Sequence, residues 1–321
     1  MNNIVGHESA VRQLRQAALA GQPAHAYLFT GPPAIGKRTL ATAFARTLNC
    51  TGEAPPCGEC RACRLIAAGR HPDVRIIGVD DAPIKIDQIR ELQRDASLAP
   101  VEARWRVFLL PNIERATREA ANSLLKTLEE PPAHVVLLLT ALDASALLAT
   151  VASRCRILPL RPLPIRDVQT ALEKRWQVEP DRAALLARLS GGRMGWAAAA
   201  LEDTAILDRR QAEVDALASV AHAGRVARLD LAHRLSRDEK HLAENLALWL
   251  SWWRDLLLVK AGTVDAVTNA DYLPALRSQA AGYGVQQIAK TIGAIRRTIR
   301  QIDANVNSRL ALEVLLLNMP S

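Results

Sequence analysis

Residues 31–37 read Gly-Pro-Pro-Ala-Ile-Gly-Lys, the G-x-x-x-x-G-K spacing of a phosphate-binding loop. In such a loop the backbone N–H groups and the start of the following helix surround phosphate oxygens, and the lysine reaches the β- and γ-phosphates. An apolar run at 26–30 precedes the loop and a helical pattern at 37–48 follows it, as this motif requires. We therefore predict a phosphate loop in which Gly31, Gly36 and Lys37 would contact a nucleotide.

The hydroxyl that should hold Mg²⁺ beside this loop is missing. An active loop places Ser or Thr directly after the lysine as a cation ligand. Arg38 stands there, and a guanidinium has no acceptor atom. Thr39 follows one residue later, about 100° further round the helix, where it should not substitute.

The carboxylate that should hold Mg²⁺ is missing as well. A nearby apolar strand normally ends in an acidic residue that binds the cation. The run at 106–110 is such a strand, but Pro111 and Asn112 follow it, and Glu114 lies further on, in a turn. Two losses in one site indicate that the chain does not hydrolyse ATP, while nucleotide binding stays open.

Four of the five cysteines lie close together in the sequence, at Cys50, Cys57, Cys60 and Cys63. Two consecutive C-x-x-C spacings suit a tetrahedral ion, and an all-cysteine set is a common closed zinc site. We predict structural zinc, because four protein ligands leave no position for a reacting water. Iron–sulfur ligation and free or disulfide-bonded thiols are the alternatives.

The same loop could instead contact nucleic acid directly. Three arginines nearby would then contribute, Arg61, Arg64 and Arg70. A net charge of +8 is compatible with such a partner, although surface solvation alone explains it equally well.

These groups require an α/β scaffold, which the first half of the sequence predicts. Apolar runs alternate with helical patterns: strands at 26–30, 74–79, 106–110 and 135–140, and helices at 11–20, 37–48, 87–97 and 115–130. Strands that alternate with helices of this length imply parallel βαβ units covered on both faces.

The second half of the sequence is helical. Three prolines within 158–164 mark a linker, and no strand pattern follows it. One long helix is expected to bury a face whose apolar residues recur at three- and four-residue spacing, Leu246, Trp249, Leu250, Trp253 and Leu257. We expect three domains, at residues 1–161, 162–207 and 208–321.

Composition places no part of this chain in a membrane. Hydrophobic residues make up 49% of it, enough for a core, but no apolar run approaches the roughly 20 residues of a membrane span. The first residues have neither the basic start nor the apolar run of a signal peptide. We expect a cytoplasmic protein.

Two further motifs point to a family. Residues 122–132 read Asn-Ser-Leu-Leu-Lys-Thr-Leu-Glu-Glu-Pro-Pro, and Ser153-Arg154-Cys155 follows about twenty residues later. With them the chain resembles the AAA+ subunits of the bacterial DNA polymerase III clamp loader, over essentially its whole length. The likeness also covers Ile4-Val5-Gly6, the phosphate loop, the four-cysteine insert, His71-Pro72-Asp73, and segments 86–90, 253–258 and 305–313.

The resemblance implies a RecA-like AAA+ domain: a P-loop parallel sheet with a zinc-binding insert at 50–63, followed by a small helical lid and an all-α collar. In this family the arginine of Ser-Arg-Cys projects into the ATP site of the neighbouring subunit, and Arg154 matches it. Such an arginine finger stabilises charge on the γ-phosphoryl group in the transition state.

Partners also follow from the resemblance. They are the gamma/tau ATPases and the delta subunit in a hetero-pentameric ring, with the sliding clamp and primer–template DNA reached through the complex. The family's motor subunits keep both Mg²⁺ ligands, and this chain lacks them. It also has Gly195 where a lid arginine would contact the nucleotide, with Arg193 nearby. We therefore expect a subunit without intrinsic ATPase activity, within a DNA-directed DNA polymerase holoenzyme.

Two other functions compete with this interpretation. An active gamma/tau-like motor ATPase would use Thr39 and a carboxylate such as Asp80 or Asp81, and its hydrolysis would depend on Lys37. A stand-alone zinc DNA-binding module would bind duplex DNA tightly and with strong salt dependence.

Overall fold

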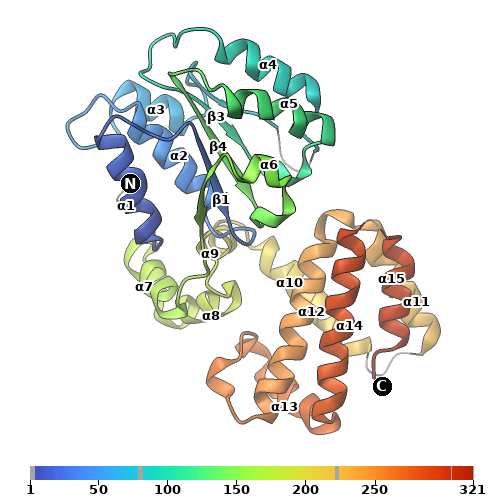
Figure 1. Ribbon diagram of the computed structural model, residues 1–321. Coiled ribbons are helices and arrows are strands. Elements are labelled where there is room, and N and C mark those ends of the chain that lie inside the picture. The colour runs from blue at the N-terminus through green and yellow to red at the C-terminus, as the bar shows by residue number, and fades with distance from the viewer. Residues whose placement is uncertain (1–3, 79–81, 221–223, 305, 321) are drawn as a thin grey trace. The chain divides into compact units, whose positions relative to one another are not determined.

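The computed structural model describes residues 4–78, 82–220, 224–304 and 306–320. The chain divides into two compact units, Met1–Ala171 with Gly192–Trp196, and Leu172–Gly191 with Ala197–Ser321 (Figure 1). Helices expected to form a lid at 162–207 are shared between these units, so the division into three domains stays a prediction.

A five-stranded parallel sheet lies at the centre of the first unit, in the order β2-β3-β4-β1-β5. Its strands are β1 Ala26–Thr30, β2 Val74–Ile76, β3 Arg106–Leu110, β4 Val135–Ala141 and β5 Arg156–Pro159. Because all strands run in one direction, the phosphate loop after β1 and the turns after β3 and β4 meet at the same sheet edge. The predicted α/β class is confirmed.

Helices cover both faces of this sheet (Figure 1). One face carries α1 Glu8–Leu19, α2 Lys37–Leu48 and α3 Arg61–Ala67, and the other carries α4 Ile86–Ala96, α5 Arg118–Glu129 and α6 Ala149–Ala152. Alternate residues of β1 enter the two cores, Tyr27 and Phe29 the first, Ala26 and Leu28 the second. Burial on both faces explains why the strands read as continuous apolar runs.

Several boundaries differ from the sequence prediction. The first helix begins at Glu8, and α5 is preceded by a short 3-10 turn, Ile113–Arg115. Strand β2 ends at Ile76, and Val79 of the predicted strand lies outside the described residues. Strand β5 was not predicted: its residues at 158–159 read as the start of the proline linker, but they pair with β1.

Described residues after β5 form only helices and turns. The helices are α7 Ile165–Trp176, α8 Pro180–Ser190, α9 Met194–Glu202, α10 Ala205–Val220, α11 Arg225–Arg237, α12 Glu239–Lys260, α13 Leu273–Gly282, α14 Val285–Asp303 and α15 Ser308–Leu317, with 3-10 turns at Val264–Ala266 and Ala270–Tyr272. In the first unit, a further 3-10 turn, Ala144–Ala146, precedes α6. None of the helices in the described ranges combines the length and apolarity that crossing a membrane requires.

The core of the second unit forms around α12. Leu246, Trp249 and Trp253 are buried, and Leu250 and Leu257 pack against them, which confirms the predicted apolar face. Its polar anchor is Asp255, fully buried on the same helix, which accepts hydrogen bonds from Asn269 N at 2.7 Å and Asn269 Nδ2 at 2.8 Å.

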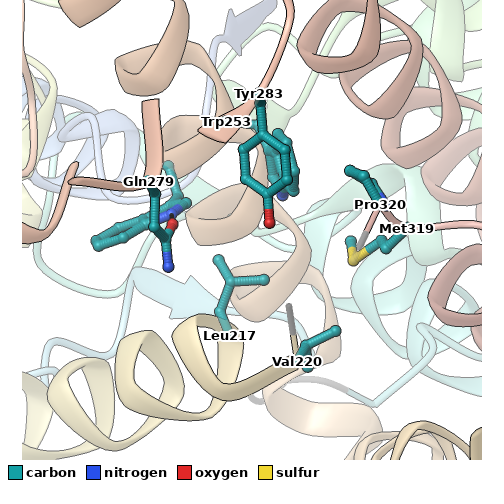
Figure 2. A pocket seen from close by; sticks show the side chains of 8 residues that line it. Leu217, Val220, Trp253, Gln279, Tyr283, Met319 and Pro320 are labelled. Atoms are coloured by element: carbon teal, nitrogen blue, oxygen red, sulfur yellow. Dashed lines mark hydrogen bonds between the residues drawn. The ribbon is translucent and has the colours of Figure 1, made fainter. Parts of the chain in front are cut away.

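Figure 2 shows a small pocket in this unit, where α10 and α12 meet the end of the chain. Its lining is mostly apolar, from Leu217, Trp253, Tyr283 and Met319. The polar Gln279 accepts a hydrogen bond from Trp252 Nε1 at 2.9 Å. No titratable cluster lines the pocket, so we assign it to packing.

Candidate functional site

The phosphate loop lies where β1 ends, before the first turn of α2. Gly31 has a φ of 147° and Gly36 a φ of 106°, values that glycine adopts with little strain. A Cβ atom on Gly31 would also approach the carbonyl oxygen of Leu160 to 2.4 Å. The backbone itself therefore requires both predicted glycines.

Lys37 begins α2, and its side chain is hydrogen-bonded to the loop. Its Nζ donates to the carbonyl oxygens of Gly31 at 2.5 Å and Pro32 at 3.0 Å. Burial lowers the pKa of Lys37, and the Glu114 carboxylate opposes that shift. The ammonium group that would reach a phosphate thus has partners within its own loop.

The start of α9 contacts the same loop. Trp196 N donates to the carbonyl oxygen of Ala34 at 3.2 Å, and a Cβ atom on Gly195 would lie 2.6 Å from that oxygen. The position matched to a lid arginine is therefore a place of close backbone contact. Arg193, the other candidate, has its guanidinium 5.9 Å from the centre of the Trp196 ring.

The two positions that should hold Mg²⁺ offer neither a hydroxyl nor a carboxylate. Arg38 and Thr39 are both exposed on α2. After β3, Asn112 adopts a left-handed backbone with a φ of 49° and supplies no carboxylate. Asp80 and Asp81, the carboxylates considered for a motor ATPase, lie outside the described residues.

Glu114 reaches the sheet edge despite its distance along the chain. The 3-10 turn after β3 carries it, and its Oε1 accepts a hydrogen bond from Leu142 N, just after β4, at 3.2 Å. Its Oε2 is buried and has no hydrogen-bond partner among the described residues. Sequence spacing missed this carboxylate, because only the fold of the turn returns it to the region of Lys37.

The four predicted metal ligands come together between α2 and α3. The sulfurs of Cys50, Cys57, Cys60 and Cys63 lie within 4.8 Å of one another. Tetrahedral zinc with Zn–S bonds of about 2.3 Å needs sulfurs about 3.8 Å apart. The sulfurs of Cys50 and Cys60 are 4.0 Å apart, so the cluster can hold such an ion with small adjustments.

Backbone N–H groups donate to these sulfurs. Cys57 N lies 3.3 Å from Cys50 Sγ, Cys60 N 3.3 Å from Cys57 Sγ, and Cys63 N 3.4 Å from Cys60 Sγ. Burial opposes ionisation of Cys60, but hydrogen bonds from backbone and side-chain donors outweigh it and lower its pKa to about 5. Burial raises the pKa of Cys63 to about 12, so ionising all four thiols calls for a cation among them.

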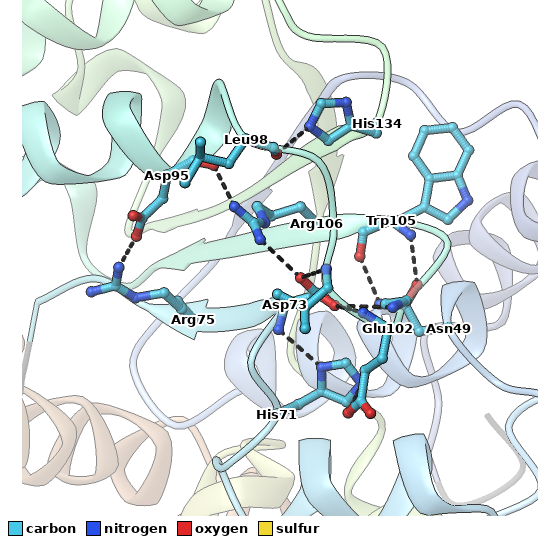
Figure 3. A network of polar contacts seen from close by, with 12 residues as sticks. Asn49, His71, Asp73, Arg75, Asp95, Leu98, Glu102, Trp105, Arg106 and His134 are labelled. Carbon is cyan, nitrogen blue, oxygen red and sulfur yellow. Dashed lines mark hydrogen bonds and ion pairs between the residues drawn. The ribbon is translucent and has the colours of Figure 1, made fainter.

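A buried polar network fixes the start of β3 in the same unit (Figure 3). Asp73 is fully buried and accepts hydrogen bonds from Val101 N at 2.8 Å, Glu102 N at 2.9 Å, Ala103 N at 2.9 Å and Arg106 Nη2 at 3.0 Å. Burial works against the charged carboxylate, but these four donors outweigh it and hold the pKa of Asp73 below its usual value.

This network also explains the His71-Pro72-Asp73 motif. His71 Nδ1 accepts a hydrogen bond from Asp73 N at 3.1 Å. Beside it, Asn49 makes two hydrogen bonds of 2.9 Å with the backbone of Trp105 (Figure 3). Because Asn49 precedes Cys50, these bonds tie the beginning of the cysteine loop to the residue directly before β3. The motif therefore fixes the segment that leads into β3, and Asn49 binds to that same segment.

Arg154 lies at the surface after α6. Its Nη2 is 2.8 Å from Glu129 Oε1, and its Nη1 donates to the carbonyl oxygen of Thr150 at 3.0 Å. The structure thus brings together the two motifs at 122–132 and 153–155. The thiol of the next residue, Cys155, is mostly buried. Burial raises its pKa to about 12 and keeps it protonated.

Comparisons with known proteins identify the family of the chain. Residues 6–164 match the family model described as DNA polymerase III, delta subunit, and residues 205–320 match DNA polymerase III, delta subunit, C terminal. The chain is 30% identical over 304 residues to DNA polymerase III subunit delta' of Bacillus subtilis, covering 91% of this chain and 90% of that protein.

Two further relatives match a smaller part of the chain. Identity to DNA polymerase III subunit delta' of Pseudomonas aeruginosa is 43% over 180 residues, 53% of this chain and 54% of that protein. Identity to DNA polymerase III subunit tau of Salmonella typhimurium is 37% over 198 residues, 59% of this chain but 30% of that protein. Because the Bacillus relative matches almost end to end and two delta-subunit models match the two parts of the sequence, the chain belongs to the delta' family of DNA polymerase III subunits.

Proposed function

We propose that this chain is a clamp-loader subunit that does not hydrolyse ATP and completes the ATP site of a neighbouring subunit with Arg154. Its partners would be the gamma/tau ATPases and the delta subunit in a hetero-pentameric cytoplasmic ring. That ring would load the sliding clamp onto primer–template DNA. One observation supports the proposal most strongly: the chain has a surface arginine in Ser-Arg-Cys, and its phosphate loop lacks the hydroxyl and the carboxylate that bind Mg²⁺.

The chain's own loop supports the first half of this proposal. Arg38 puts a positive charge where a cation ligand should be, and Asn112 stands where a carboxylate should be. Glu114 is the carboxylate that does reach the edge, but one of its oxygens already accepts from Leu142 N. A nucleotide phosphate would also have to displace two carbonyl oxygens from Lys37.

The position of Arg154 supports the second half. Its side chain is 36% exposed and its partner Glu129 is 51% exposed, so their ion pair contributes at most about 1 kcal/mol. Exchanging this carboxylate for a γ-phosphoryl group of the neighbour therefore costs little. The planar guanidinium can donate two hydrogen bonds to phosphoryl oxygens as their charge grows in the transition state.

The cysteine loop would hold zinc in a structural role. Four thiolates fill a tetrahedral coordination sphere, so bound zinc would supply a cross-link and no reacting water. The cross-link would close the loop from Cys50 to Cys63, whose first end Asn49 fixes to the residue directly before β3. Metal analysis of the purified chain is expected to give one zinc per chain. Substoichiometric metal that does not rise on reconstitution, or an iron–sulfur absorption band, would refute this assignment.

ATP hydrolysis measured in two settings tests the proposal. The purified chain with Mg²⁺ should show no turnover above a Lys37→Ala control. A ring reconstituted with ATPase subunits should lose turnover at the one site that receives Arg154 when the chain carries Arg154→Ala or Arg154→Lys. Removing an arginine finger costs about 10³- to 10⁵-fold at that site.

Two matched variants make this test specific. Arg156→Ala removes a neighbouring exposed arginine, which bonds to Gln13, and should leave turnover unchanged. Glu129→Gln releases Arg154 and should not lower turnover. Normal turnover with Arg154→Ala would refute the finger assignment, and Lys37-dependent turnover by the isolated chain would favour the motor ATPase.

A further inference from the structure

Helix α14 is amphipathic, and its outer side is basic. Its inner face is buried in the core of the second unit, with residues such as Ile288, Thr291, Ile295 and Thr298 at 4% exposure or less. Among the residues of α14 whose burial the structure describes, the exposed charged ones are Lys290, Arg296, Arg297 and Arg300, here called the basic stripe. The sequence from 285 to 300 contains no Asp or Glu.

The basic stripe covers one side of the helix. At about 100° per residue, its four residues fall within an arc of about 120°, and at about 1.5 Å per residue they span about 15 Å. Within the described part of the chain, none of the four forms an ion pair. Other arginines of the same unit do pair, such as Arg309 with Glu313 at 2.8 Å.

Small residues form the floor between these charges. Gly293 lies at the middle of the arc and Ala289 on the same side, one turn earlier. A glycine in a helix interior costs about 1 kcal/mol relative to alanine. A Cβ atom on Gly293 would lie 3.7 Å from Arg297 Nη1. Its absence lets a ligand approach the helix backbone between the side chains.

These features indicate the chemistry of a partner. The apolar face of α14 is already buried in its own bundle, so the helix cannot insert that face into a lipid surface or a hydrophobic groove. What remains is a row of cations that form no ion pair with the described residues, separated by small residues, and such a row suits a regular polyanion. Duplex DNA carries one negative charge per roughly 1.7 Å of axis, so a 15 Å stretch has about nine phosphates on its two strands, more than the four cations could contact.

We propose that the basic stripe of α14 binds the phosphate backbone of duplex DNA. The stripe would be a DNA-contacting surface of the proposed clamp-loader subunit. The inference depends on that proposed function only because the complex would bring duplex DNA close to the stripe. The contact is sequence-independent, because phosphate oxygens are the same at every base pair. Its strength should therefore depend steeply on salt.

Fluorescence anisotropy of a labelled short duplex with the full chain tests the site. Four phosphate contacts give a slope of about −3.6 in log affinity against log salt, or a loss of about 10²-fold between about 50 and 200 mM. A variant with Lys290→Gln, Arg296→Gln, Arg297→Gln and Arg300→Gln should lose that part of the slope and bind about 10²-fold more weakly at low salt.

A charge-matched control separates the stripe from net charge. It replaces one lysine and three exposed arginines elsewhere in the second unit, Lys174→Gln, Arg182→Gln, Arg209→Gln and Arg225→Gln. Equal losses in both variants, unchanged binding in the α14 variant, or no duplex binding by the wild-type chain at low salt would each overturn the proposal. So would an α14 variant that binds DNA normally but no longer joins the ring, which would indicate an acidic protein partner. The assay uses no ATP, so failure of the Arg154 proposal leaves its outcome unaffected.

Discussion

Replacing Asp73 with asparagine should destabilise the first unit strongly. Each carboxylate oxygen accepts two hydrogen bonds, from Val101 N and Arg106 Nη2 on one side and from Glu102 N and Ala103 N on the other. An amide of the same shape replaces one oxygen with an NH₂ group. Whichever way it turns, that group faces two donors and accepts from neither.

The expected magnitude follows from burial. Asp73 is 0% exposed and Arg106 is 7% exposed, so the variant leaves a guanidinium buried without its counter-charge. Breaking a buried pair from one side costs about 3–5 kcal/mol. The matched control is Asp87→Asn, because Asp87 is 85% exposed and its pair with Arg90 contributes at most about 0.5 kcal/mol.

Amide hydrogen exchange measures this loss of stability at the three residues whose N–H groups bind Asp73. Protection of Val101, Glu102 and Ala103 should fall by about 10²- to 10⁴-fold in Asp73→Asn, which is 3–5 kcal/mol at 1.4 kcal/mol per tenfold. Urea unfolding of the first unit should shift to lower denaturant. Unchanged protection at these amides, with an unchanged urea midpoint, would refute the reasoning.

The effect should also depend on pH. The hydrogen bonds hold the folded-state pKa of Asp73 below its ordinary value of 3.8. The carboxylate therefore contributes its full stabilisation above about pH 4 and loses it as the pH falls through the lower folded-state value. The difference between wild type and Asp73→Asn should be constant near neutrality and shrink below about pH 4.

Three further outcomes are expected. Gly195→Ala should cost about 1–3 kcal/mol and expose the phosphate loop to hydrogen exchange, because its Cβ atom would lie 2.6 Å from the Ala34 oxygen. The control is Gly282→Ala, whose Cβ atom would meet no atom within 4 Å, so this variant should not lose stability. Cys155, with its pKa raised to about 12 from 9.0, should alkylate about a thousand-fold more slowly than an exposed cysteine at pH 8 in the folded chain, and normally in urea. Cys63→Ser should reduce bound metal and lower the melting temperature, while Cys155→Ser should retain the metal; equal metal content in both variants would contradict the four-cysteine site.

The sequence alone determined those features of this protein that depend on residues close together in the chain. Continuous apolar runs predicted β1, β3 and β4, because strands buried on both faces need no alternation. Paired C-x-x-C spacings predicted a cysteine cluster that the structure does bring together. The missing Mg²⁺ ligands were visible from Arg38 and Asn112 alone.

Contacts between distant segments were decided by the tertiary structure. The ion pair of Arg154 with Glu129 depends on how α5 and α6 pack, and the place of Glu114 depends on one 3-10 turn. A proline-rich segment forms strand β5 because it pairs with β1. Asp73 accepts hydrogen bonds from residues about thirty positions later in the chain. Periodicity reports which face of an element is apolar, but it carries no information on which polar groups from other elements will meet there. Those meetings follow from the packing of the whole sheet and its helices.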